Sequence, residues 1–193
     1  MNRGSANHQP SRVLQRRGPG LTGRTGRLYW SVAIRHKPLL YLETSLFGFY
    51  FDEEPRNASR RDAVAALFDQ IRLGILDAAT SSRTVLELNR AAEPLRSKLL
   101  SLLADTRLLD VDDSEAERLA SAYLREGVIP DREVEDARHV AYATVGRTDV
   151  PVSLNLRHLA NEWAERNIGA VNLREGYQLI SIRMPEEVLR YEG

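Results

Sequence analysis

A short apolar run that ends abruptly at a carboxylate constrains the fold more than any other part of this chain. Residues 39–42 read Leu-Leu-Tyr-Leu, and Glu43, Thr44 and Ser45 follow at once. An apolar run without alternation is typical of a strand buried on both faces, as in a parallel sheet. Ligand sites of such sheets lie at the carboxyl ends of their strands. The sequence therefore predicts a buried strand with Glu43 at the functional edge of the sheet.

Strand-like segments alternate with segments of helical periodicity along the rest of the chain. The predicted strands are residues 39–42, 75–80, 107–111, 150–154 and 179–182. The predicted helices are residues 57–72, a segment from 81 or 82, 95–103, 114–124, a segment from 131, 159–166 and a segment from 185. This alternation predicts an α/β fold of three layers, α/β/α, around a mainly parallel sheet of about five strands. Residues 28–34 form either a further short strand or a lead-in to the first one.

Charge divides the chain into two parts. The sequence has 27 basic and 27 acidic residues, but residues 1–37 hold eight basic residues and no acidic one. Residues 1–27 are also rich in Gly, Ser, Asn and Pro, which is typical of a disordered segment. We therefore expect a basic tail at 1–37 and an acidic globular domain at 38–193. The tail is either an artefact of a start codon assigned too far upstream or a basic arm that contacts nucleic-acid phosphates.

Several classes of protein are excluded by what the sequence lacks. It has no cysteine, which excludes disulfides, thiolate metal sites and cysteine nucleophiles and fits a cytoplasmic location. No apolar run approaches the roughly 20 residues that span a bilayer, and no apolar segment of a signal peptide follows the first arginines. We therefore expect no membrane association. Walker, Gly-x-Ser-x-Gly and His-Glu-x-x-His motifs are also missing from the sequence.

Four polar side chains are predicted to meet at the carboxyl edge of the sheet. Glu43 and Asn155 end predicted strands, and Glu87 and Asp136 lie early in predicted helices. Three neighbouring carboxylates repel one another unless a cation neutralises them. Oxygen ligands without cysteine favour Mg²⁺ or Mn²⁺, which can activate water against a phosphodiester. Spacing alone leaves an alternative open for each of two residues. Glu87 either lies at the site or faces solvent, and His139 either binds the metal or only forms hydrogen bonds.

Four short blocks carry a resemblance to a known family. They are Tyr-Leu-Glu-Thr-Ser at 41–45, Thr-Val-Leu-Glu-Leu at 84–88, Asp-Ala-Arg-His-Val-Ala-Tyr-Ala-Thr at 136–144 and Val-Ser-Leu-Asn-Leu-Arg-His-Leu-Ala-Asn at 152–161. In this order, and with Met-Pro-Glu-Glu-Val-Leu at 184–189, they resemble the acidic-site blocks of PIN domains. The similarity is closest to VapC-like ribonuclease toxins of type II toxin–antitoxin systems. It implies a metal-dependent ribonuclease on a twisted parallel sheet of order 3-2-1-4-5.

The resemblance also implies roles for individual residues. Glu43, Glu87 and Asp136 match the catalytic acidic positions that hold Mg²⁺ or Mn²⁺, and Asn155 matches the fourth, more variable position. Glu43 and Asn155 both stand where many PIN domains have Asp. Ser45 matches a small hydroxyl residue beside the site, where it could contact the substrate. An antitoxin protein and a homodimer are the partners that the resemblance implies.

Two further segments have two interpretations each. Arg157 and His158 either contact substrate phosphate or stabilise a turn. The aromatic segment 46–51 either packs in the core or offers rings on which bases stack.

The leading prediction is a metal-dependent endoribonuclease acting on RNA, held silent by an antitoxin. The alternative is a catalytically weak RNA-binding or interaction protein of the same fold. A metal-dependent phosphatase ranks lower, because its nucleophilic Asp would have to stand where the chain has Glu43.

Overall fold

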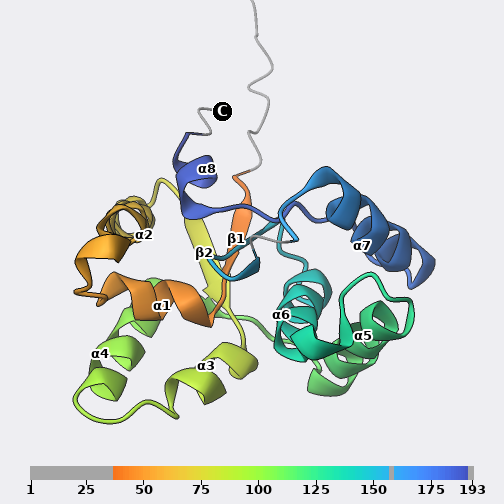
Figure 1. The fold of residues 1–193 in the computed structure, drawn as a ribbon, viewed down its shortest axis with the longest axis horizontal. Helices are drawn as coiled ribbons and strands as arrows, with labels where there is room; N and C mark the ends of the chain where they lie inside the picture. Colours follow the sequence, from red (N-terminus) through yellow and green to blue (C-terminus); the bar gives the residue numbers. More distant parts are fainter. Residues whose placement is uncertain (1–36, 157–158, 191–193) are drawn as a thin grey trace, which may run out of the picture. The chain divides into compact units, whose positions relative to one another are not determined.

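Strand β1 (Leu39–Leu42) lies at the centre of a parallel sheet in the computed structural model (Figure 1). It pairs with β2 (Asp77–Thr80) on one side and with β4 (Val150–Val152) on the other. Strand β3 (Arg107–Leu108) pairs with β2, which gives the order β3-β2-β1-β4. All four residues of β1 are buried. The prediction of a doubly covered central strand is confirmed.

The structure describes residues 37–156 and 159–190, which belong to one compact unit. Residues 1–36 of the predicted basic tail, which include the segment 28–34, and the pair Arg157 and His158 lie outside the described residues. Within the described ranges, no helix is long and apolar enough to cross a membrane.

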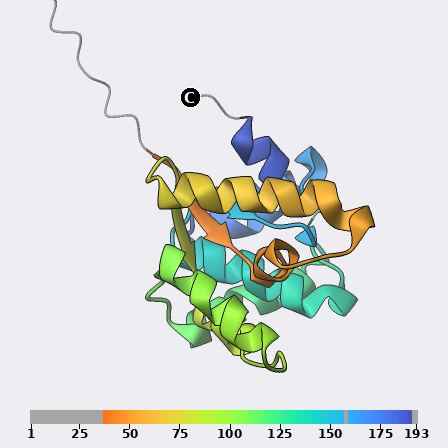
Figure 2. The same ribbon diagram turned by 90° about the vertical axis from the view of Figure 1, so that its left-hand side faces the viewer.

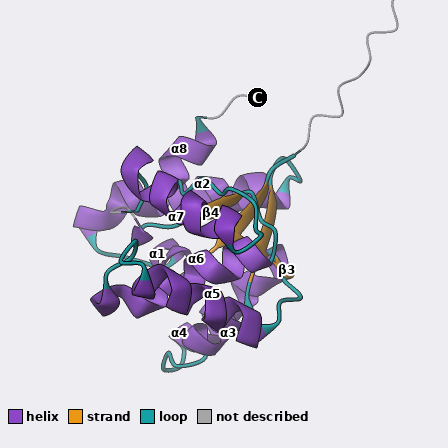
Figure 3. Ribbon diagram, turned by 90° about the vertical axis from the view of Figure 1, so that its right-hand side faces the viewer, coloured by secondary structure: helices purple, strands orange, loops and turns teal. Residues whose placement is uncertain are grey.

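Helices connect the strands and cover both faces of the sheet. They are α1 (Thr44–Tyr50), α2 (Ala58–Arg72), α3 (Ser82–Leu88), α4 (Leu95–Leu102), α5 (Asp113–Arg125), α6 (Val134–Val145), α7 (Glu162–Arg174) and α8 (Pro185–Leu189). In Figure 1, α1 to α4 and α8 lie on one side of the strands and α5 to α7 on the other. Figure 2 looks onto the first of these layers, and Figure 3 shows the opposite side.

The two faces of β1 explain the three layers. Successive side chains of a strand point to opposite faces. Leu40 and Leu42 pack in a cluster with residues of α1, α2 and α4, whereas Tyr41 packs with Ala116 of α5 and Tyr142 of α6. A strand buried on both faces thus joins the two helical layers, and the predicted α/β/α architecture is confirmed.

The sheet has four strands among the described residues, one fewer than the predicted number of about five. The predicted strand at 179–182 contributes only a single parallel bridge, between Val152 and Arg183. Ser181 N and Arg183 N donate to Asp149 O (3.2 Å) and Pro151 O (2.9 Å), as a fifth strand beside β4 would. A second bridge would need the backbone N–H of residue 151 to donate back to the 179–182 segment. Residue 151 is a proline and has no N–H. The segment still lies beyond β4, so the order of the chain across the sheet follows the implied 3-2-1-4-5.

Three helix starts differ from the prediction. The helix expected from residue 131 begins at Val134 as α6, because Asp131–Glu133 form a short 3-10 helix before it. α5 is capped by the side chain of Asp112, which accepts from Ser114 N at 2.8 Å, and not by Ser114. α7 runs from Glu162 to Arg174 and replaces the helix expected at 159–166, because the side chain of Asn161 accepts from Ala164 N at 3.0 Å and fixes the start there.

Candidate functional site

Glu43 lies at the carboxyl end of β1, where the sequence placed it. Its side chain is 3% exposed and caps α1 by accepting from Ser45 N at 2.7 Å. The Ser45 hydroxyl donates to the same carboxylate and accepts from Leu154 N at 3.3 Å. Ser45 therefore links the carboxylate to the loop that follows β4. Glu43 serves here as a buried helix cap as well as a candidate ligand.

Glu87 lies in the last turn of α3 and faces the protein. Ser81 starts this helix by accepting from Thr84 N, as predicted for a cap at 81 or 82. The Glu87 carboxylate, 16% exposed, accepts hydrogen bonds from the Thr44 hydroxyl, from Arg83 Nε at 2.9 Å and from His139 Nε2 at 3.2 Å. The alternative of a solvent-facing Glu87 is wrong, because the side chain is held by residues from three helices.

His139 joins the two helical layers at this edge. It is buried on α6, and its two ring nitrogens contact different groups. Nδ1 lies 2.9 Å from the Tyr41 hydroxyl, and Nε2 contacts Glu87. The Tyr41 hydroxyl in turn lies 2.8 Å from Ser81 Oγ. The imidazole thus forms hydrogen bonds, which was one of the two roles predicted for His139, and it connects β1, α3 and α6.

The charges at this edge are coupled. Burial disfavours the charged imidazole, but the oxygens of Tyr41, Glu87 and Glu43 outweigh it and raise the pKa of His139 to about 10. Burial likewise opposes ionisation of Glu87, but bonds from His139, Thr44 and Arg83 lower its pKa to about 2. At neutral pH the edge therefore holds a protonated His139 between the Tyr41 hydroxyl and the ionised Glu87 carboxylate. The repulsion that the sequence predicted is relieved by cations of the chain itself.

Asp136 and Asn155 lie at the periphery of this group. Asp136 is partly exposed in the first turn of α6, one helical turn before His139. Asn155 is exposed beyond β4, in a loop held by Ser153, whose Oγ accepts from Asn155 N at 2.9 Å. The structure thus joins Glu87 to His139 and to Thr44, the neighbour of Glu43, and it places Asp136 one helical turn before His139 on α6.

The fit of a divalent metal depends on donor type and on arrangement. The carboxylate oxygens are the type that Mg²⁺ and Mn²⁺ take. Across residues 37–156 and 159–190, however, no three His, Asp or Glu side chains are grouped so that they could hold a metal ion. Protein donors occupy Glu43 and Glu87. The residue types fit a hard cation, and a metal ion would compete with these protein donors for the two carboxylates.

Three residues of this network were not singled out as site residues from the sequence. Arg83 precedes Glu87 by four residues on the same helix, a spacing that places two side chains together and could have revealed the pair. Thr44 is adjacent to Glu43 in the chain. Tyr41 gave no signal, because its hydroxyl meets His139 only after β1 and α6 have packed.

Comparison with known proteins adds no family to this picture. The chain matches none of the family models against which it was scanned, and the search of curated proteins found no match.

Proposed function

We propose that this protein is an endoribonuclease that hydrolyses RNA phosphodiester bonds at the edge formed by Glu43, Glu87 and Asp136. One observation carries the proposal. Glu43 and Glu87 come from separate strand–helix units, yet Thr44, the neighbour of Glu43, donates to Glu87, which also contacts His139, at the carboxyl end of a parallel sheet. Ligand and catalytic sites of such sheets are concentrated at this edge.

The residues supply the parts that such a reaction needs. Hydrolysis requires a group that accepts hydrogen bonds or a proton from water, and positive charge near the phosphate. Glu87 is ionised at neutral pH, and Arg83 and His139 place positive charge beside it. A bound Mg²⁺ or Mn²⁺ would add Lewis-acid stabilisation of the phosphate and a more acidic water. Asp136, partly exposed nearby, is the third carboxylate that we assign to this edge.

A partner follows from the resemblance to VapC-like toxins. We propose an antitoxin protein that silences the nuclease and a homodimer as the working form. Both rest on sequence similarity to that family.

One observation favours a second candidate function, in which the protein binds RNA without cutting it. Arg83 and His139 already neutralise Glu87, and the Glu43 carboxylate accepts from Ser45. A site whose charges are balanced internally has less need of a metal ion, and cleavage would be weak.

RNA cleavage by the purified protein separates the two candidates. The assay compares Mn²⁺ with EDTA, and wild type with Asp136→Asn. Asp131→Asn is the matched control, since Asp131 is exposed in the turn before α6 and undergoes the same change of charge. Cleavage that needs Mn²⁺ and is lost only in the Asp136 variant supports the nuclease.

Two results would contradict the nuclease. If folded wild type freed of copurified protein is as inert as the variant, RNA binding without cleavage becomes the better account. If wild type and Asp136→Asn cut equally, the site is placed wrongly or a contaminant is responsible.

A further inference from the structure

The aromatic segment after Glu43 divides into buried and accessible rings. Phe47 is fully buried and packs edge-on against Phe68, with ring centroids 5.7 Å apart. Phe49 and Phe51 are only partly buried, and each carries a cation over its ring, Arg60 at 6.0 Å and Lys98 at 6.0 Å. Phe49 and Phe51 pack against the edge of the same core cluster, but part of each side chain stays exposed.

The cations around these rings belong to a minority of the basic residues that the structure describes. Most arginines that the structure describes are paired with a carboxylate, for example Arg72 with Asp105 and Arg118 with Glu175. Within the described part of the chain, Arg60, Arg90 and Lys98 are exposed and form no ion pair. An exposed cation without a counter-ion is free to bind an anion from outside. This grouping is notable on a domain with more acidic than basic residues.

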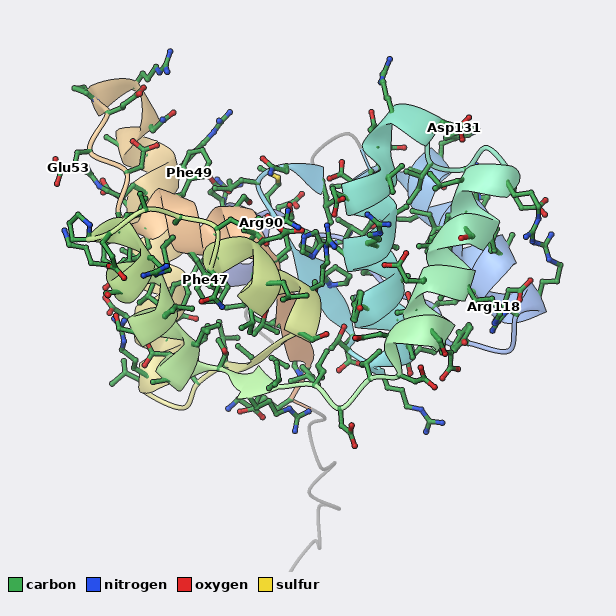
Figure 4. The ribbon with its side chains drawn as sticks, turned by 90° about the horizontal axis from the view of Figure 1, so that it is seen from below. Phe47, Phe49, Glu53, Arg90, Arg118 and Asp131 are labelled. Carbon is green, nitrogen blue, oxygen red and sulfur yellow. The ribbon has the colours of Figure 1, made fainter. Side chains whose placement is uncertain are left out.

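These residues lie on or next to helices that contact those of the candidate site. Helix α1 bears Phe49 and contacts α2, α3 and α4. Arg60 lies on α2 and Lys98 on α4. Arg90 lies two residues beyond α3, and its backbone N–H donates to Glu87 O at 3.0 Å. Figure 4 shows Phe49 and Arg90 on the same side of the domain, with Arg118 and Asp131 on the other. We call Phe49, Phe51, Arg60, Arg90 and Lys98 the α1 patch.

We propose that the α1 patch binds single-stranded RNA and leads it to the carboxylates Glu43 and Glu87. Unpaired bases stack on aromatic rings and on arginine side chains, and cations bind the phosphates between them. In a duplex the bases are stacked on one another and are not available to these rings. The proposal rests on the proposed function for its substrate, but it concerns binding and is tested apart from cleavage.

The test measures binding of a fluorescently labelled single-stranded RNA by anisotropy in EDTA, at several salt concentrations. Phe49→Leu keeps an apolar side chain against the core and removes the aromatic face. It should weaken binding about 5- to 150-fold, the range of a lost base–aromatic stack, with the salt dependence unchanged.

A second variant tests the cations. Arg60→Gln, Arg90→Gln and Lys98→Gln together should reduce the slope of log affinity against log salt by about 2, since each phosphate contact on a single strand contributes about 0.7. Arg147→Gln is the matched control, because Arg147 is also exposed and, within the described ranges, forms no ion pair, but it precedes β4 at the opposite edge of the sheet. Circular dichroism confirms that each variant is folded.

The outcomes separate this inference from the nuclease itself. Weaker binding in both patch variants, with wild-type binding in Arg147→Gln, supports the patch even if no protein cuts RNA. The inference is overturned if wild type does not bind single strands, if duplex RNA binds as tightly, or if the patch variants bind like wild type. The last result, together with intact cleavage, would keep the nuclease and leave the patch to a different partner, such as an acidic protein segment.

Discussion

Replacing His139 with glutamine tests whether a buried imidazolium holds the candidate site together. The change removes a charged hydrogen bond to Glu87 and the Nδ1 contact to the Tyr41 hydroxyl. Hydrogen bonds to charged groups contribute about 1.5–3 kcal/mol each. In the variant Glu87 still accepts hydrogen bonds from Arg83 and Thr44. The loss of stability therefore stays below the loss expected when a buried charge has no partner. We expect His139→Gln to lower the free energy of unfolding by about 2–4 kcal/mol at pH 6.

The pH dependence of this loss follows from the two pKa shifts. The pKa of His139 is raised from 6.5 to about 10, so its contribution is fully present below pH 6.5 and is lost as pH rises towards 10. The pKa of Glu87 is lowered from 4.5 to about 2, so its contribution is present above pH 4.5 and is lost as pH falls towards 2. The pair therefore stabilises the fold most between pH 4.5 and 6.5.

Urea denaturation followed by circular dichroism, in EDTA at pH 6.5 and 8.5, measures the effect. In this range each added pH unit lowers the free energy of unfolding of wild type by up to about 1.4 kcal/mol more than that of the variant. The reason is that His139 loses its proton in the unfolded state but keeps it in the folded state, and the variant has no histidine at this position. The difference between the two proteins should therefore shrink by about 2 kcal/mol. Glu87→Gln, alone and with His139→Gln, closes a double-mutant cycle that isolates the ion pair. A difference that does not change with pH would show that His139 is neutral in the folded protein and would refute the reasoning.

Three further substitutions test packing elsewhere in the domain. Gly146→Ala should lower the free energy of unfolding by about 1–3 kcal/mol in urea denaturation, because a Cβ there would lie 2.6 Å from Leu109 Cδ1. In contrast, Gly48→Ala in α1, where a Cβ meets nothing within 4 Å, should raise it by about 0.5–1 kcal/mol; equal effects of the two changes would contradict the packing argument. Asn172→Ala should lower the thermal midpoint, with a loss of about 2–4 kcal/mol, since the buried Tyr123 hydroxyl donates to Asn172 at 2.5 Å. A midpoint unchanged from wild type would show that this bond contributes nothing.

Local sequence determined the frame of this protein. The apolar run at 39–42 gave a strand buried on both faces, and the alternation of strand and helix patterns gave three layers with Glu43 at the carboxyl edge. These features depend on residues close together in the chain, so periodicity and end signals reveal them. The predicted extra strand at 179–182 reduced to one bridge because Pro151, on a different segment, offers no N–H.

Tertiary structure alone decided how the charges at the edge are arranged. His139 contacts Tyr41 and Glu87, which lie 98 and 52 residues away in the sequence, and these contacts arise only when β1, α3 and α6 pack together. Sequence pattern predicted carboxylates that repel one another and call for a metal ion. The fold instead places His139 and Arg83 beside Glu87. The reason is physical: whether a charge is paired depends on distance and burial in three dimensions, and spacing along the chain reports neither.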